Sequence, residues 1–303
     1  FPIMGKSKRF GEMIALEYIN KIEPETEKQF SAITVILPDN TIYVSYRGTD
    51  NTLIGWKEDF NMIFKSHIAS QISAKEYLEN IAKKYPNKKI RIGGHSKGGN
   101  LAVYASIFAD SEVKKRIINV YNNDGPGFNE DIINTEEYKK SIEKVITYIP
   151  QDSIFGMLLN HEEKYTVVQS TQKGVMEHDV YSWQVIGRNF VVLKEVTNGS
   201  KFIDKTITNW LKNLDLQTRE QVIDIVFEII NSTEARTIAD LKLSLMKNAK
   251  IILSSYKHIE PENKKMITAT ITALFGIVKE NVKEEYKNNI NKEKENLWKK
   301  TIN

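Results

Sequence analysis

Residues 90–104 read IRIGGHSKGGNLAVY and contain the motif Gly94-x-Ser96-x-Gly98. The residues just before the glycines, 88–92 (KKIRI), suit a short strand, and residues 100–108 carry apolar side chains at helical spacing. A strand, a tight turn and a helix together expose a serine hydroxyl at the turn, and glycines two positions away on either side let strand and helix approach closely. The stretch therefore predicts a nucleophilic Ser96, with an ordinary glycine-rich turn and an incidental serine as the alternative.

The composition is that of a globular protein. The chain has 303 residues, of which 41% are hydrophobic, which suits one large α/β domain or a domain with an appendage. It contains no cysteine, so disulfides, thiolate metal sites and a cysteine nucleophile are excluded. We expect neither a metal nor an organic cofactor.

No segment is typical of a membrane span or a signal peptide. The longest apolar-leaning stretch, residues 266–278, is interrupted by threonines and a glycine and is too short to cross a bilayer. The sequence opens with Phe1-Pro2 instead of a methionine, as a truncated start would give. We expect a soluble, cytoplasmic protein, with export without a cleavable signal peptide as the alternative.

The net charge of +4 is concentrated in the last third of the chain. Residues 201–303 contain 18 Lys and Arg against 14 Asp and Glu, whereas residues 1–200 contain 25 of each. In the last third the two signs are interleaved, as on a solvated helix face, and do not form a basic patch. We therefore expect no nucleic-acid partner.

The first two hundred residues predict a largely parallel sheet with helices on its faces. Residues 6–30 are predicted to be helical, followed by a hairpin of residues 32–37 and 41–46 around a Pro-Asp-Asn turn. A helix over about 69–85 leads to the serine strand. Further strands, separated by helical stretches, are predicted at residues 117–121, 145–149 and 165–169.

From about residue 200 the pattern changes to helices alone. Helical periodicity is visible at 217–230, 238–256 and 264–286, and Asn198-Gly199-Ser200 is the expected boundary. We therefore predict an α/β domain over 1–199, truncated at its start if the first residues are missing, and a helical region over 200–303.

A serine hydroxyl needs an imidazole to take its proton, and five histidines compete for that role. His95 adjoins the serine, His67 precedes it and His258 lies in the helical region. His161 and His178 both follow the serine, as the order Ser, acid, His requires. His178 comes after the last predicted strand and is favoured over His161, which precedes that strand. An uninvolved loop histidine is the alternative reading of His178.

Two carboxylates follow predicted strands and can orient the imidazole. Asp152 leaves the strand just before that of His178, and we prefer it on chain order. Asp124 is the alternative acid, and its structural interpretation is a brace for the turn Gly125-Pro126-Gly127. Asp179 is adjacent to His178 and too close in sequence to orient its ring.

The expected oxyanion donors are the amide of Lys97 and a group of Gly48-Thr49, to which the Thr49 hydroxyl can add. Large apolar side chains follow at Leu53, Ile54 and Trp56. They suit an acyl-chain wall or a small lid, although plain core packing explains Trp56 equally well.

Taken together, these motifs resemble class 3 lipases of the α/β-hydrolase fold. The resemblance rests on the hairpin, Tyr46-Arg47-Gly48-Thr49, Trp56-x-x-Asp59, the Gly94-His95-Ser96-x-Gly98-Gly99 turn, Asp152 and His178. The chain is more similar still to an uncharacterised bacterial family of lipase-like hydrolases, carried as a domain of unknown function. That likeness covers roughly residues 5–195 and rests on residues 93–102, residues 121–128, Gly156-Met157-Leu158-Leu159 and His178-Asp179-x-Tyr181-Ser182-Trp183.

The resemblance implies a carboxyl-ester or lipid hydrolase with Ser96, Asp152 and His178 as its triad and Thr49 at the oxyanion hole, and it adds Met157 to the substrate-binding residues. Lys97 departs from the pattern, because lipases place an apolar residue there; its charge would favour a charged substrate or would simply be solvated. A thioesterase or peptidase is a narrower alternative.

A hypothesis of another class is a catalytically silent hydrolase fold whose helical region binds a protein partner, itself unknown, or a membrane surface peripherally. The basic excess and length of residues 201–303 favour it.

Overall fold

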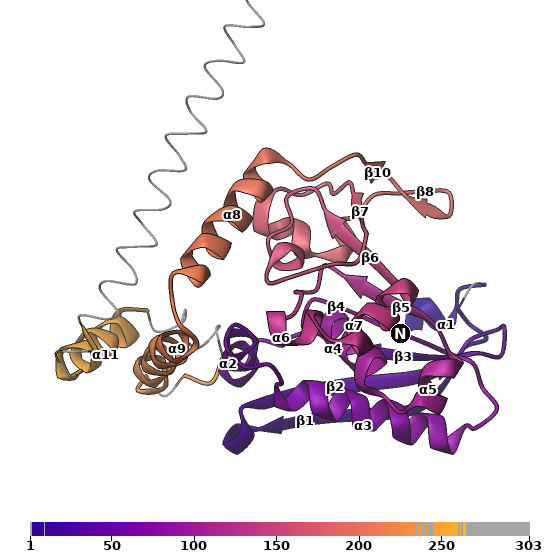
Figure 1. Cartoon of the computed structure of the whole chain (residues 1–303), viewed down its shortest axis with the longest axis horizontal. Helices are drawn as coiled ribbons and strands as arrows, with labels where there is room; N and C mark the ends of the chain where they lie inside the picture. The colour runs from indigo at the N-terminus through magenta and orange to yellow at the C-terminus, as the bar shows by residue number, and fades with distance from the viewer. Residues whose placement is uncertain are drawn as a thin grey trace, which may run out of the picture.

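The centre of the molecule is an eight-stranded sheet in the order β1-β2-β3-β4-β5-β6-β7-β10, shown in Figure 1. The computed structural model describes residues 2–264 except 9, 234, 238–239, 241–244, 260 and 262. The strands are β1 Ile14–Glu23, β2 Lys28–Ile36, β3 Ile42–Tyr46, β4 Ile90–His95, β5 Ile117–Asn123, β6 Val145–Pro150, β7 Tyr165–Val168 and β10 Val192–Leu193. Strands β3 to β7 run parallel, and the pairs β1·β2, β2·β3 and β7·β10 are antiparallel. A separate hairpin is formed by β8 Val185–Ile186 and β9 Asn189–Phe190.

Helices flank this sheet, as the alternation of strands and helical stretches predicts. The α-helices are α1 Pro2–Gly5, α2 Leu53–Asn61, α3 Ala69–Lys84, α4 Lys97–Phe108, α5 Ser111–Arg116, α6 Glu130–Ile133, α7 Glu136–Ser141, α8 Asn198–Lys212, α9 Leu216–Asn231 and α11 Leu245–His258. Short 3₁₀ turns lie at η1 Pro24–Thr26, η2 Ile142–Lys144, η3 Phe155–Met157, η4 Gly174–His178 and η5 Val180–Ser182. The mostly parallel sheet with its flanking helices is an α/β-hydrolase fold, as expected.

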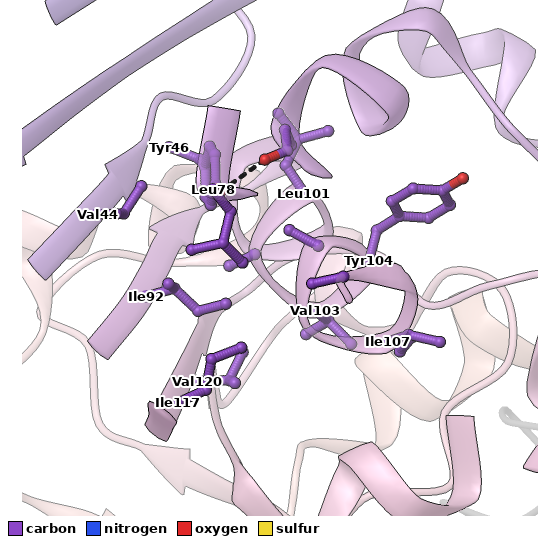
Figure 2. Packing of buried hydrophobic residues seen from close by; sticks show 14 of the residues in the cluster. Val44, Tyr46, Leu78, Ile92, Leu101, Val103, Tyr104, Ile107, Ile117 and Val120 are labelled. Carbon is purple, nitrogen blue, oxygen red and sulfur yellow. Dashed lines mark hydrogen bonds between the residues drawn. The ribbon is translucent and has the colours of Figure 1, made fainter. Parts of the chain in front are cut away.

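The main core lies between the parallel strands and helices α3 and α4, and Figure 2 shows its packing. Val44, Ile92 and Val120 come from three adjacent strands and are fully buried. Leu78 of α3 and Leu101 of α4 pack in the same cluster, also without exposure. Burying one such side chain contributes about 1.5–3 kcal/mol, so this layer holds α4 rigidly on the sheet.

Strands β2 to β7 confirm the hairpin and the later strands that the sequence predicts, but the predicted helix over residues 6–30 is wrong. Residues 14–23 form β1, which pairs antiparallel with β2 from Ile14 opposite Ile36 to Glu23 opposite Lys28. The apolar residues at positions 14, 15, 18, 19 and 22 follow a helical spacing, so the local pattern by itself predicts a helix. Without β1, one edge of the largely buried strand β2 would be unpaired. Residues 14–23 form a strand because pairing satisfies the backbone groups of that edge.

After β10 the described chain is helical. Helix α9 confirms the helical periodicity at 217–230, and α11 covers the second half of the stretch 238–256 and ends two residues beyond it. In Figure 1 the orange α8 and α9 lie on the side of the molecule that carries α2, and α9 contacts α2 directly. The periodic stretch 264–286 and the apolar segment 266–278 lie outside the described residues, apart from residue 264. Within the described part of the chain, no helix is both long and apolar enough to cross a bilayer. The division at residue 199 remains a prediction.

Candidate active site

Ser96 occupies the turn between β4 and α4 with a backbone conformation that non-glycine residues rarely adopt. Its φ is 57° and its ψ is −133°. The close approach that holds this turn is possible because a Cβ on Gly98 would lie 2.3 Å from the carbonyl oxygen of Tyr46, and one on Gly94 would lie 2.3 Å from the backbone of Gly98. The predicted strand, turn and helix are confirmed, and the strain is of the kind found at functional sites.

His178 is hydrogen-bonded to the alternative acid, Asp124. Its Nδ1 lies 2.6 Å from Oδ2 of Asp124, a residue with no exposed surface at the end of β5. The other oxygen of Asp124 accepts hydrogen bonds from the Ser153 hydroxyl at 2.5 Å and the Gly156 amide at 3.1 Å. The carboxylate is therefore fixed in place and turned toward the imidazole.

Asp152, the preferred acid, does not contact His178, and that prediction is corrected. Its carboxylate accepts hydrogen bonds from the Thr197 hydroxyl and the Gly174 amide, on the side of the loop that leads to α8. The physical reason lies in the strand order: Asp124 follows β5, the direct neighbour of the serine strand β4, whereas Asp152 follows β6, one strand farther away. Both acids satisfy the order Ser, acid, His, so chain order alone did not separate them.

Two aromatic rings hold the His178 imidazole from its sides. The ring of Phe155 lies 4.2 Å from it and the ring of His95 lies 4.3 Å from it, measured between centroids. Nε2 of His95 also lies 2.6 Å from the carbonyl oxygen of His178 and donates to it. Burial and the neighbouring His178 lower the pKa of His95, so this ring acts as a neutral donor that positions the His178 backbone.

The remaining histidines bond elsewhere. His67 bonds to the hydroxyl of Tyr104, and His161 lies 3.0 Å from the carboxylate of Glu163. His258 bonds to a carbonyl within α11. The preference for His178 among the five histidines thus agrees with the contacts, and no cluster of metal-ligand side chains occurs in the described part of the chain.

The loop after β3 lies directly against the serine. A Cβ on Gly48 would be 3.2 Å from the Cβ of Ser96, so Gly48 and the next residue, Thr49, lie close to the nucleophile turn. The Thr49 hydroxyl donates to the carboxylate of Asp59, with oxygen distances of 2.7 and 2.6 Å. Because that hydroxyl has one hydrogen and Asp59 takes it, the expectation that the hydroxyl adds an oxyanion donor is corrected, and the backbone amide of Thr49 is the remaining candidate donor.

Lys97 opens α4, and the first amides of a helix have no carbonyl partner one turn back. The backbone amide of Lys97 is therefore suited to the predicted role of oxyanion donor. Its ammonium is neither at the substrate nor solvated, which corrects both expectations for this side chain. It lies in the interior with 0% side-chain exposure, 2.9 Å from Glu58 and 2.8 Å from the side-chain oxygen of Gln29.

An apolar cavity of about 110 Å³ opens beside Ser96. Trp56 lines it, as predicted, together with Asp59 and Phe155. The other lining residues are Phe60, Met62, Ile63, Lys97, Pro126, Leu158 and Leu159. Burial raises the pKa of Asp59 to about 6, while the charge of Lys97 acts to lower it.

Three predicted substrate-binding residues do not line this cavity. Leu53 is buried at the first turn of α2, Ile54 is partly buried beside it, and Met157 packs against the cluster that contains Ile149 and Val167. On α2 the cavity-facing residues follow Trp56 at helical spacing, and a helical reading of residues 53–63 could have found Phe60. Leu158 and Leu159 replace Met157, and φ of Leu159 is 63°, a local turn that periodicity does not predict.

A family model and several solved structures match the chain. A model of the Mbeg1-like family matches residues 4–228. No curated protein sequence matches the chain. Similar solved structures include the Rhizomucor miehei lipase propeptide complex, with 15% identity and a TM-score of 0.40 over 53% of this chain and 58% of that chain.

Lip2 lipase from Yarrowia lipolytica is 14% identical, with a TM-score of 0.35 over 52% of this chain and 65% of that chain. A triacylglycerol lipase from Penicillium expansum is 12% identical, with a TM-score of 0.35 over 62% of this chain and 84% of that chain. The chain thus spans less than two thirds of the length of the Rhizomucor and Yarrowia proteins.

Proposed function

The chain belongs to the Mbeg1-like family, and from the geometry of its site we propose that it is a serine hydrolase that cleaves carboxyl esters, with Ser96, His178 and Asp124 as its triad. One observation carries the proposal. A fully buried carboxylate holds Nδ1 of the imidazole at 2.6 Å, and the imidazole ring lies 4.3 Å from the ring of His95, the residue directly before a serine whose φ is 57°. A buried carboxylate in this position fixes the tautomer in which Nε2 is free to accept a proton.

In the proposed reaction, Oγ of Ser96 attacks the ester carbonyl carbon while Nε2 of His178 takes the hydroxyl proton. The charge that forms on the imidazole is stabilised by Asp124. The carbonyl oxygen becomes an oxyanion and accepts hydrogen bonds from the amides of Lys97 and Thr49. When the intermediate collapses, the alcohol leaves with the proton from Nε2, and the acyl group stays on Ser96.

Water then hydrolyses the acyl-enzyme, with water as the nucleophile and Oγ of Ser96 as the leaving group. His178 takes a proton from the water as it attacks the acyl carbon, and the proton then returns to Oγ of Ser96 as the carboxylic acid leaves. Only Ser96 and His178 exchange protons in this cycle, while Asp124 and the two amides act through hydrogen bonds.

The substrate class is a lipid or other apolar acyl ester. This part of the proposal is supported by the lining of the cavity, where Trp56, Phe60, Ile63 and two leucines surround Ser96. A pocket with this lining stabilises an alkyl chain through burial of its methylene groups, about 0.8 kcal/mol for each.

The test compares wild type with Ser96→Ala on p-nitrophenyl esters of increasing chain length. We expect turnover by the wild type, loss of at least about a thousandfold in the variant, and labelling of the wild type alone by a fluorophosphonate probe. Equal rates in the two proteins would refute the proposal. A folded wild type with neither turnover nor labelling would favour a silent fold that serves as a binding module.

A further inference from the structure

The Lys97 ammonium lies at the centre of a buried polar cluster behind the nucleophile turn. Side-chain exposure is 0% for Lys97 and 1% for Glu58, and the two groups are 2.9 Å apart. The ammonium also donates to the backbone carbonyl of Gln29 at 3.0 Å and to the side-chain oxygen of Gln29 at 2.8 Å. All three of its hydrogens are thus used inside the protein.

Glu58 is equally well satisfied. Its carboxylate accepts the amide of Gln29 at 2.9 Å, the amide of Ser70 at 2.8 Å and the hydroxyl of Ser70 at 2.7 Å. These bonds join β2, α2, α3 and α4 at one point. The two charged groups therefore have the hydrogen bonds that a buried ion pair needs if it is to be stable, while Nε2 of Gln29 has no partner in the cluster.

The cluster connects to the oxyanion site through the next residue of α2. Asp59 follows Glu58, and its Oδ1 lies 3.8 Å from the Lys97 ammonium. The same carboxylate accepts the hydroxyl of Thr49 through both oxygens. The backbone of Lys97 thus supplies one proposed oxyanion amide. Its side chain is linked through Asp59 to Thr49, which supplies the other.

We propose that Lys97 is a positioning residue for the oxyanion site: its buried ammonium keeps Asp59 ionised and in place, and Asp59 in turn holds Thr49 against Ser96. The proposal rests on the proposed ester hydrolysis. It assigns a function to Lys97, the cation that occupies the position where the lipase pattern has an apolar residue.

The electrostatics of Asp59 give the proposal a measurable consequence. Burial raises the pKa of Asp59 to about 6, Lys97 and His178 lower it, and Glu58 raises it. Lys97 has the larger effect of the two residues in the ion pair, so we expect the pKa of Asp59 to rise when both charges are removed. The carboxyl would then be partly protonated near neutral pH, and its hold on the Thr49 hydroxyl would weaken.

The experiment uses the full chain in three forms. Lys97→Met alone leaves Glu58 as an uncompensated buried charge, and we expect it to lose stability. Lys97→Met combined with Glu58→Gln removes the pair together and is expected to recover most of that loss. The matched control is Lys57→Met, which removes a second buried lysine. Lys57 lies on α2 and pairs with Asp224 and Glu27, not with Glu58 or Asp59.

In the double variant we expect kcat for p-nitrophenyl butyrate to fall at least about tenfold, while KM changes less than about threefold. The Asp59 carboxyl, followed by carbon-detected NMR with Asp59→Asn for assignment, should titrate at higher pH than in wild type. The Lys57→Met control should keep kcat and the Asp59 titration of wild type.

A double variant that regains stability together with wild-type kcat would overturn the proposal, because the ion pair would then be purely structural. An Asp59 carboxyl that is still protonated at pH 8 in wild type would overturn it as well, and this measurement needs no variant to fold. Failure of the proposed function is separate: it would appear as wild-type protein without serine-dependent turnover, whatever the Asp59 titration shows.

Discussion

Asp124 accepts three hydrogen bonds in a place without solvent, and its φ of 52° turns the residue back under the imidazole. This conformation lets a single side chain reach His178, Ser153 and Gly156 at once. Asp152 by contrast is partly exposed and bonds to Thr197. The two acids therefore differ in what their loss would do.

We predict that Asp124→Asn lowers kcat for a p-nitrophenyl ester by about 10⁴-fold, because an amide can hold the imidazole in the wrong tautomer. Asp152→Asn should change kcat by less than about threefold, as expected of a group that acts on a loop. Steady-state kinetics on the two purified variants, with circular dichroism to verify folding, decides the matter. A larger loss of kcat in Asp152→Asn than in Asp124→Asn would show that Asp152, which follows β6, is the catalytic acid.

At this scale the sequence predicts the residue types better than their contacts. Ser96 and His178 could be found because a motif and the chain order select them. The acid could be narrowed to Asp124 and Asp152 but not chosen between them, because strand adjacency is a property of the sheet and not of the order along the chain. The direction of the Lys97 side chain was equally hidden, since its partners Gln29 and Glu58 are 68 and 39 residues away.

Between elements, the turn depends on how closely α4 approaches the end of β3. Gly98 lies in the first turn of α4, and its missing Cβ leaves room for the carbonyl of Tyr46 and the backbone of Arg47. Any side chain there has to push the helix away from the strand. Because Ser96 and the Lys97 amide sit at the same junction, such a shift moves nucleophile and oxyanion donor together.

We predict that Gly98→Ala destabilises the protein by about 1–3 kcal/mol and lowers kcat at least about tenfold. The control is Gly199→Ala at the start of α8, where a Cβ would meet only the Thr197 hydroxyl at 3.7 Å. Urea denaturation and ester kinetics measure the two effects. A wild-type kcat in Gly98→Ala would contradict the inference that a side chain at position 98 pushes α4 away from β3.

Most of the sheet could be predicted at this scale, and the first strand could not. The runs that became β3 to β7 are short, rich in β-branched residues and bounded by turn residues, so their period is unambiguous. The stretch that became β1 is ten residues long and half exposed, and its strand state comes from pairing with β2. Pairing with a distant segment is a tertiary effect that a local pattern cannot carry.

Across the whole molecule, the helices after β10 reach the candidate active site through α2. Ile223 and Phe227 of α9 form a buried cluster with Phe64, and Trp56 and Ile63 pack against it. Trp56 and Ile63 also line the cavity beside Ser96. The ring of Phe60, another lining residue, meets that of Phe227 edge to face at 5.8 Å. One wall of the cavity is therefore supported from behind by α9.

We predict that Phe227→Ala, at a residue that is 6% exposed, loosens this wall and raises KM for p-nitrophenyl octanoate roughly threefold to tenfold, equivalent to about 1 kcal/mol of lost burial. KM for the acetate ester should stay the same, because its acyl group does not reach the wall. Hydrogen exchange should rise in α9 and along the cavity face of α2. Val226→Ala, at the neighbouring residue that is 38% exposed, is the control and should match wild type in both measurements. If exchange rises in α9 while KM for the octanoate ester does not change, the helices stabilise the chain without shaping the cavity, and the connection through Phe60, Trp56 and Ile63 is refuted.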